Sequence, residues 1–183
     1  MNFEKKFEVF WQFFHDNGGY TVVLEGLRNT LIIAVLGLVI GIIIGTLIAT
    51  ARVVPKTNPL VKILDWIARL YVSFFRGTPI VVQLLLFYYV LMPLLSINLK
   101  SVPVAVVVFG LNSGAYISEI MRAGILSVDS GQMEGGRSVG LSFGTTMIKI
   151  IIPQAVKNIL PTLGNEFISL IKETSVAVSY THL

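Results

Sequence analysis

The sequence predicts an all-α protein, a bundle of several helices that span a membrane. Of its 183 residues 54% are hydrophobic and only 13% are charged, whereas a soluble domain has about a quarter of its residues charged. Three long stretches contain no charged residue at all, which indicates that lipid is their solvent. The net charge of +4 fits the excess of Lys and Arg on the cytoplasmic side of membrane proteins.

The same composition excludes several kinds of site. There is no cysteine, which excludes disulfides and thiolate metal sites. The two histidines, His15 and His182, are too far apart in the chain for a metal cluster. No basic stripe interleaved with aromatic residues indicates nucleic acid, and no phosphate-binding loop or nucleophile elbow occurs. We therefore predict a protein that is not an enzyme, with no catalytic residue, no metal and no cofactor.

Residues 1–26 are expected to form an N-terminal interfacial segment outside the membrane. Its early apolar residues share one face at helical spacing, which is typical of a helix that lies in the membrane surface. A disordered end is the alternative. The face is made of Phe7, Phe10, Trp11 and Phe14.

The first predicted span covers approximately residues 29–51, which lie between Arg28 and Arg52 without a charge. At 1.5 Å per residue this stretch is long enough to cross roughly 30 Å of hydrocarbon. Small residues recur within it every fourth position and share one helix face, which lets another helix approach closely. Chance spacing in a glycine-rich membrane protein is the alternative. The residues are Gly37, Gly41 and Gly45.

Residues 52–76 form a basic connection with five Lys and Arg residues and a single acid, Asp65. Pro55 and Pro59 interrupt its first part. From Leu60 onward the apolar positions follow helical spacing with the charges off that stripe. This pattern predicts a helix along the membrane surface.

Two more charge-free stretches predict spans at 77–98 and 101–118, joined by a short turn at Lys100. Such a turn makes neighbouring helices antiparallel. The region 119–149 is polar, rich in glycine and too charged to span. It is therefore expected to be a loop.

A fourth span is predicted at 150–171. It differs from the others because it contains Lys157, Pro161, Asn165 and Glu166, which a lipid-facing helix would not carry. We expect it inside the bundle or beside a water-filled path.

The orientation follows from the basic residues. The connection 52–76 carries five of them and the turn at Lys100 carries one, so the positive-inside rule places 52–76 in the cytoplasm. Alternation then puts 119–149 in the cytoplasm and the N-terminus outside.

The segment from Glu134 reads EGGRSVGLSFGTTMIKIIIP and resembles the Glu-Ala-Ala loop of permease subunits in bacterial ATP-binding-cassette (ABC) importers. Glycines replace both family alanines, which costs about 2 kcal/mol of helix propensity. A solvated loop with incidental glycines is the alternative. The positions in register are Glu134, Gly135, Gly136, Gly140, Ile150, Ile152 and Pro153.

The physics of such a loop is simple. A helix with small side chains enters a groove on a partner without clashing, and Gly140 can turn the chain with a positive φ. Glu134 is well placed to pair with a basic group of the partner.

Further motifs narrow the resemblance to the polar amino acid uptake family. The run Arg76-Gly77-Thr78-Pro79, followed by Gln83, resembles the cytoplasmic start of that family's second core helix. The residues around Ala115-Tyr116 and around Lys172-Glu173 are also similar to it. Together these motifs cover about 27–178.

The resemblance implies that 27–183 is the transmembrane domain of a type I ABC importer permease in the bacterial inner membrane. Its implied partners are an ABC ATPase dimer, a second permease subunit (identical or homologous), and a solute-binding protein, periplasmic or lipid-anchored. A polar amino acid is the implied substrate. Family members continue through one more spanning helix, so we expect this chain, which stops at Leu183, to lack the last family helix.

Four polar residues at membrane depth are candidates for the substrate path: Glu166, Asn165, Asn112 and Tyr116. Glu166 either contacts the ammonium group of the substrate or pairs with a basic side chain, because an isolated acid at this depth is costly. Asn112 and Tyr116 are four residues apart and share a helix face, where they either line the path or form hydrogen bonds between helices. Glu119 and Arg122 are expected to form a local ion pair.

Two other functions remain open. A secondary transporter or channel subunit not driven by ATP usually shows more spans or internal repeats, and no repeat is found here. The other is a membrane scaffold with no transport role.

Overall fold

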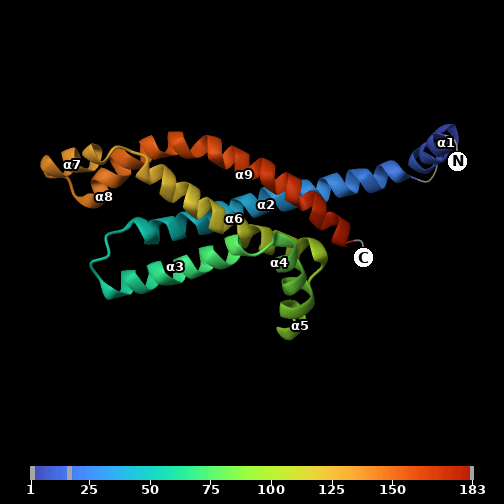
Figure 1. The fold of residues 1–183 in the computed structure, drawn as a ribbon, viewed down its shortest axis with the longest axis horizontal. Helices are drawn as coiled ribbons and strands as arrows, with labels where there is room; N and C mark the ends of the chain where they lie inside the picture. The colour runs from blue at the N-terminus through green and yellow to red at the C-terminus, as the bar shows by residue number, and fades with distance from the viewer. Residues whose placement is uncertain (1–2, 16–17, 182–183) are drawn as a thin grey trace.

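The computed structural model describes residues 3–15 and 18–181, which form helices and short connections without a strand in those ranges. The predicted all-α architecture is confirmed, while His182 lies outside the described residues. Four long helices lie lengthwise beside one another, with α1 at one end and α7 and α8 at the other (Figure 1). The elements are α1 (Phe3–His15), α2 (Gly19–Val53), α3 (Pro59–Gly77), α4 (Ile80–Leu86), the π-helix η1 (Phe87–Leu91), α5 (Met92–Leu94), α6 (Ser101–Leu126), α7 (Ser130–Ser138), α8 (Phe143–Thr146), the π-helix η2 (Met147–Ile151) and α9 (Ile152–Thr181).

The glycine stripe of α2 packs directly on α6, as the spacing predicts. A β-carbon added to Gly41 would lie 2.8 Å from the Ser113 Oγ, and one added to Gly45 would lie 2.7 Å from the Ile117 Cγ2. The packing is reciprocal, because Ile44 of α2 lies equally close over a glycine of α6. Small residues thus let the two backbones approach to a distance that larger side chains would prevent.

The chain bends sharply between α3 and α4. The two helix axes differ by 105°, and the break falls at Thr78 and Pro79, which both have extended backbone angles. The residue before a proline disfavours helical backbone angles, because the proline ring crowds the backbone of that residue. The bend thus lies at the start of the segment predicted as a span at 77–98, and the π-helical turn η1 follows α4 within that segment. That the segment spans a membrane stays a prediction.

The segment expected along the membrane surface forms α3, and its placement relative to a membrane stays a prediction. Helix α3 packs against α2 and α6 and buries one face of four residues. By length and apolar content α2 and α6 are each able to cross a membrane, and α3 with α4–α5 counts as a third, bent span. The buried face consists of Asp65, Ala68, Val72 and Phe75.

Helices α6 and α9 extend beyond their predicted limits, α6 to Leu126 and α9 to Thr181. Pro161 lies inside α9. Helix α9 is less apolar than α2 and α6 and is too polar to count among the helices that could cross a membrane. This agrees with its unusual polar residues. It nevertheless contributes Leu170 to the core, where that side chain packs with Phe109 of α6.

Helix α1 confirms the helical face predicted near the N-terminus. The rings of Phe7 and Trp11 stack with centroids 6.1 Å apart, and those of Phe10 and Phe14 lie 5.8 Å apart. These four side chains share the face expected from their spacing. The placement of α1 in a membrane surface stays a prediction.

Candidate functional site: the end of the bundle and the polar groups at membrane depth

Helix α7 is a short exposed helix beyond the end of the bundle (Figure 1). Asp129 caps it by accepting a hydrogen bond from the backbone N–H of Gly131 at 2.6 Å, which satisfies a free donor of the first turn. Gly140 ends it with a φ of 86°, where other residues would pay a steric cost. Glu134 lies on this helix with its side chain exposed.

The paired glycines of α7 have different surroundings. Gly136 is buried against α8, and a β-carbon there would lie 2.5 Å from the Thr146 Cγ2. A β-carbon on Gly135 would meet nothing within 4 Å. Of these two glycines, Gly136 must be small to keep the contact between α7 and α8. The side of α7 at Gly135 is open to a partner.

The loop returns to the bundle through α8 and η2. Ser142 caps α8 by accepting a hydrogen bond from the Thr145 N–H at 3.1 Å, and η2 leads directly into α9. The Asn158 side chain of α9 donates to the Ser127 Oγ at 2.8 Å, which ties α9 to the end of α6. Of the three aliphatic and proline positions in the motif, Ile150 is half-buried, and Ile152 and Pro153 are exposed.

Asn112 holds the bend between α3 and α4. Its side-chain nitrogen donates to the Phe75 carbonyl and to the Gln83 Oε1, both at 3.1 Å. Gln83 is 1% exposed, and its own nitrogen donates to the Phe75 carbonyl at 2.9 Å and to the Thr78 Oγ1 at 2.7 Å. The two amides thus satisfy backbone groups that the broken helix leaves free.

Asn112 is a predicted path residue with a hydrogen bond between helices as the alternative, and it makes such hydrogen bonds to α3 and α4, while its place on the path stays a prediction. Gln83 is not among the predicted site residues. A polar side chain within an otherwise apolar stretch was the available signal, because such a group needs a partner inside a membrane.

Arg76 and Tyr116 meet at this bend. The Arg76 Cζ lies 5.1 Å from the centroid of the Tyr116 ring, a geometry that favours a cation–π interaction. Gly77 has open space around it, and the Thr78 hydroxyl donates to the Phe74 carbonyl at 2.8 Å. The residues predicted at the start of the second core helix therefore form the corner that precedes α4.

Glu166 is half-buried on α9 and reaches across to α6. The Ser113 hydroxyl donates to its Oε1 at 3.1 Å, and among the described residues it has no ion-pair partner within 4 Å. The neighbouring Asn165 is exposed. Of the predicted path residues, Glu166 contacts Ser113 of α6, and Tyr116 contacts Arg76 of α3.

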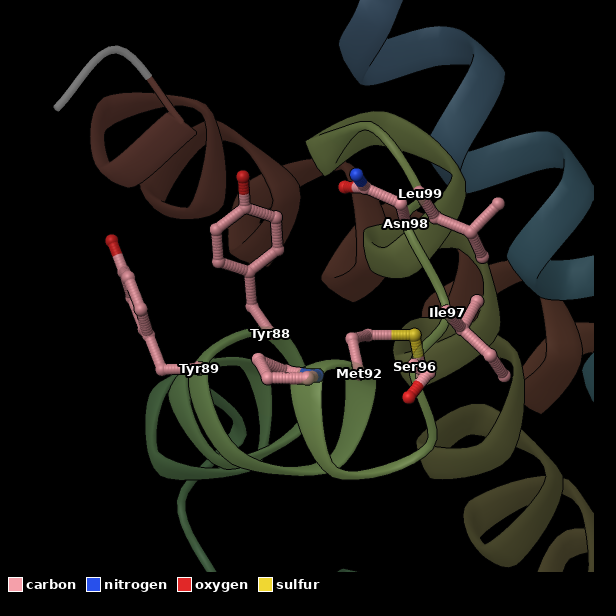
Figure 2. A pocket seen from close by; sticks show the side chains of 8 residues that line it. Tyr88, Tyr89, Met92, Ser96, Ile97, Asn98 and Leu99 are labelled. Atoms are coloured by element: carbon pink, nitrogen blue, oxygen red, sulfur yellow. The ribbon is translucent and has the colours of Figure 1, made fainter.

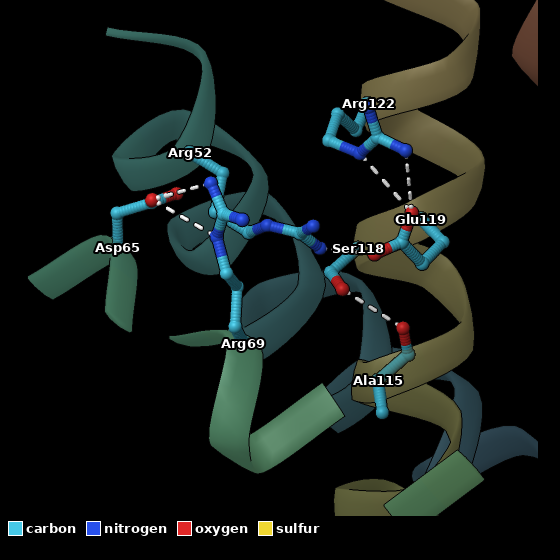
Figure 3. A network of polar contacts seen from close by, with 7 residues as sticks. All are labelled: Arg52, Asp65, Arg69, Ala115, Ser118, Glu119 and Arg122. Carbon is cyan, nitrogen blue, oxygen red and sulfur yellow. Dashed lines mark hydrogen bonds and ion pairs between the residues drawn. The ribbon is translucent and has the colours of Figure 1, made fainter. Parts of the chain in front are cut away.

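Two ion-pair clusters lie at the α7 end of the long helices (Figure 3). Glu119 of α6 accepts from Arg52 of α2 and, at 2.9 Å, from Arg122. Asp65 of α3 pairs with Lys56 at 2.5 Å and with Arg69 at 2.9 Å. The expected Glu119–Arg122 pair is confirmed, whereas Arg52 was missed because it lies 67 residues away in the sequence.

Two grooves lie among the described residues. One of about 450 Å³ is lined by residues of η1 and α5 and by the loop from Ser96 to Leu99, and in Figure 2 the Tyr88 ring stands between Tyr89 and Asn98. The other, of about 500 Å³, lies between α6 and α9 and includes Glu119 and Asn158. None of the predicted path residues lines either groove.

Known proteins resemble this chain over most of its length. The family model described as "Binding-protein-dependent transport system inner membrane component" matches residues 37–181. The L-cystine transport system permease protein of Bacillus subtilis is 42% identical over 158 residues, which cover 86% of this chain and 65% of that protein. The arginine transport system permease protein of the same organism is 42% identical over 154 residues, covering 84% and 68%.

Solved structures of transporters are also similar to this chain. One described as an amino acid ABC transporter with histidines has a TM-score of 0.80 at 39% identity and covers 92% of this chain and 76% of its own. The MetNI methionine ABC transporter in an inward facing conformation has a TM-score of 0.61 at 20% identity, covering 82% and 68%. The latter shows a shared fold alone. The chain spans about two thirds of the length of the curated relatives named above.

Proposed function

The chain belongs to the family of binding-protein-dependent transport system inner membrane components, and from this we propose that it is the transmembrane permease subunit of an ATP-driven importer of polar amino acids. The expected membrane-helix fold of an ABC importer permease is confirmed by the structural matches. Such a subunit is non-catalytic, so ATP hydrolysis belongs to a separate ATPase. The identity of about 40% to permeases named for L-cystine and arginine supports an amino acid as substrate.

The position of α7 carries the proposed coupling to the ATPase. This helix lies beyond the ends of α6 and α9 with Glu134 and Gly135 exposed, while Gly136 faces inward on Thr146. A partner can therefore bind the exposed face of α7 without disturbing the contact between α7 and α8. The tight packing makes α7, α8 and η2 a stiff connection between α6 and α9, so that movement of α7 moves both helices.

Glu166 is the proposed contact for the substrate ammonium group. Its carboxylate has a single hydroxyl donor, Ser113, among the described residues, so it retains capacity to accept from a cation. An acid at this depth needs either such a cation or water. Asn165 beside it and Tyr116 with Arg76 are the other polar groups proposed for the path.

The assembly proposed around this chain follows its family. Two permease subunits, identical or homologous, would stand on an ATPase dimer and receive the amino acid from a solute-binding protein outside. The connection 52–58 and the segment 127–151 lie at the same end of the bundle (Figure 1), which we place in the cytoplasm of the inner membrane, with the N-terminus outside.

Glu134→Arg tests the coupling in proteoliposomes that hold the full importer with its ATPase and solute-binding protein. We expect the variant to insert normally but to lose ATP-dependent uptake and the stimulation of ATPase activity by loaded binding protein. The matched control is Glu8→Arg, which reverses an exposed charge on α1 at the opposite end. Uptake at normal rates in Glu134→Arg would refute the assignment, and uptake driven by an ion gradient without ATP would favour a secondary transporter.

A further inference from the structure

The outer face of α3 carries two neighbouring stripes of different chemistry. Positions 62, 66 and 69 place Lys62, Trp66 and Arg69 on one side of the helix, because residues three and four apart are neighbours. Trp66 is 61% exposed and the Arg69 side chain 60%. Beside them runs an apolar stripe that we call the lipid strip. It consists of Ile63, Ile67, Leu70 and Phe74, with exposures between 47% and 55%.

The charges of the basic stripe are not neutralised within the chain. Within the described ranges Asp65 is the acid that pairs with Arg69, and it shares its carboxylate with Lys56. Lys62 has no ion-pair partner among the residues that the structure describes. Three cations against one anion leave a local charge of +2.

The stripe lies beside other charged groups of the bundle. The ion-pair clusters of Arg52–Glu119 and Asp65–Arg69 gather charges from α2, α3 and α6 (Figure 3). We place this level at the boundary of the hydrocarbon, because Lys and Arg extend to lipid headgroups there and tryptophan is enriched. From this level the lipid strip runs along α3 toward the bend.

We propose that this face of α3 binds an anionic phospholipid of the cytoplasmic leaflet. Its phosphate lies against Lys62 and Arg69, the Trp66 ring sits at the headgroup level, and its acyl chains lie along the lipid strip. The two stripes run side by side along α3, so a lipid whose phosphate meets the cations can lay its chains on the neighbouring apolar residues, which continue past Arg69 to Phe74. The two cations beside an apolar strip match the charge and the chains of an anionic lipid, which favours lipid over a protein partner.

The binding is tested by quenching of Trp66 fluorescence with brominated lipids in proteoliposomes of the full importer. The Trp66 signal is the difference between complexes with Trp11→Phe and complexes with Trp11→Phe plus Trp66→Phe, which cancels the partners' tryptophans. Brominated phosphatidylglycerol is compared with brominated phosphatidylcholine. We expect phosphatidylglycerol to quench at the lower mole fraction.

Lys62→Gln should weaken that preference by about fivefold, the contribution of one basic residue at an anionic membrane surface. The matched control is Lys100→Gln, which removes an exposed cation from the loop before α6 and should leave the preference unchanged. Equal quenching by the two lipids, or an unchanged preference in Lys62→Gln, overturns the proposal. The absence of quenching by either lipid also overturns it, because α3 would then be covered by a protein such as the second permease subunit. The measurement needs no transport, so it stands apart from the proposed function.

Discussion

Gly136 of α7 packs so closely on Thr146 of α8 that a β-carbon on the glycine would lie 2.5 Å from the threonine Cγ2. Thr146 is fully buried and its hydroxyl donates to the Ser142 carbonyl at 3.0 Å, so it has little freedom to move aside. The neighbouring Gly135 has open space instead. One glycine therefore holds the loop together, and the other faces outward.

Adding a side chain at Gly136 and at Gly135 should have opposite consequences inside the chain. Gly136→Leu must separate α7 from α8, so we expect it to abolish ATP-dependent uptake and increase proteolysis of the loop in detergent-solubilised complex. Gly135→Ala should keep uptake and strengthen α7 by about 1 kcal/mol of helix propensity. Equal protease resistance of Gly136→Leu and the parent protein would show that the contact does not stiffen the loop.

Removing one partner of the Arg52–Glu119 pair should lower the free energy of unfolding more than its share of the loss when both partners are replaced. Their side chains are 12% and 18% exposed, so removing one partner leaves a poorly solvated charge at a cost of about 3 kcal/mol. Replacing both by methionine should cost less than the sum of the two single changes, because the poorly solvated Arg52 and Glu119 charges are removed together and Arg122, the other partner of Glu119, is 34% exposed and reaches water. Denaturant unfolding of Arg52→Met, Glu119→Met and the double variant measures this. Additive losses would mean that the pair is not coupled.

The amide pair at the bend makes a separate prediction. Gln83→Leu removes the donor to Phe75 and Thr78 and leaves Asn112 without one acceptor, so we expect a loss of about 1–3 kcal/mol, the cost of unsatisfied buried polar groups. The control is Gln154→Leu, an exposed glutamine on α9, which should change stability little. Thermal unfolding of the solubilised complex compares the two. A Gln83→Leu variant as stable as the control would show that water satisfies the bend.

Local sequence patterns predicted much of this fold, but they did not predict the contacts between segments that are distant in the sequence. The stripe from Gly37 to Gly45 is a periodic signal, and it predicted close packing without naming α6 as the partner. The absence of charge over 77–98 hid the bend, although a threonine before Pro79 carries a conformational preference that could have revealed it. The Arg52–Glu119 pair and the Ser113–Glu166 hydrogen bond join residues 67 and 53 positions apart, which no local period encodes.

Glu166→Gln separates the charge of that residue from its shape. Glutamine can still accept the Ser113 hydrogen bond, so the contact between α6 and α9 survives while the negative charge is lost. If the carboxylate binds the substrate ammonium group, the KM for uptake should rise about tenfold or more, since a hydrogen bond between charged groups contributes about 1.5–3 kcal/mol.

Ser113→Ala is the matched variant, because it removes the hydrogen bond and keeps the charge. We expect it to change the KM much less than Glu166→Gln does, and Asn165→Ala, which alters the exposed neighbour, should lie between them. Uptake kinetics with a saturating solute-binding protein in the same vesicles distinguish the three. If instead Ser113→Ala raises the KM as strongly as Glu166→Gln, the carboxylate serves to pack α6 against α9 and the substrate contact lies elsewhere.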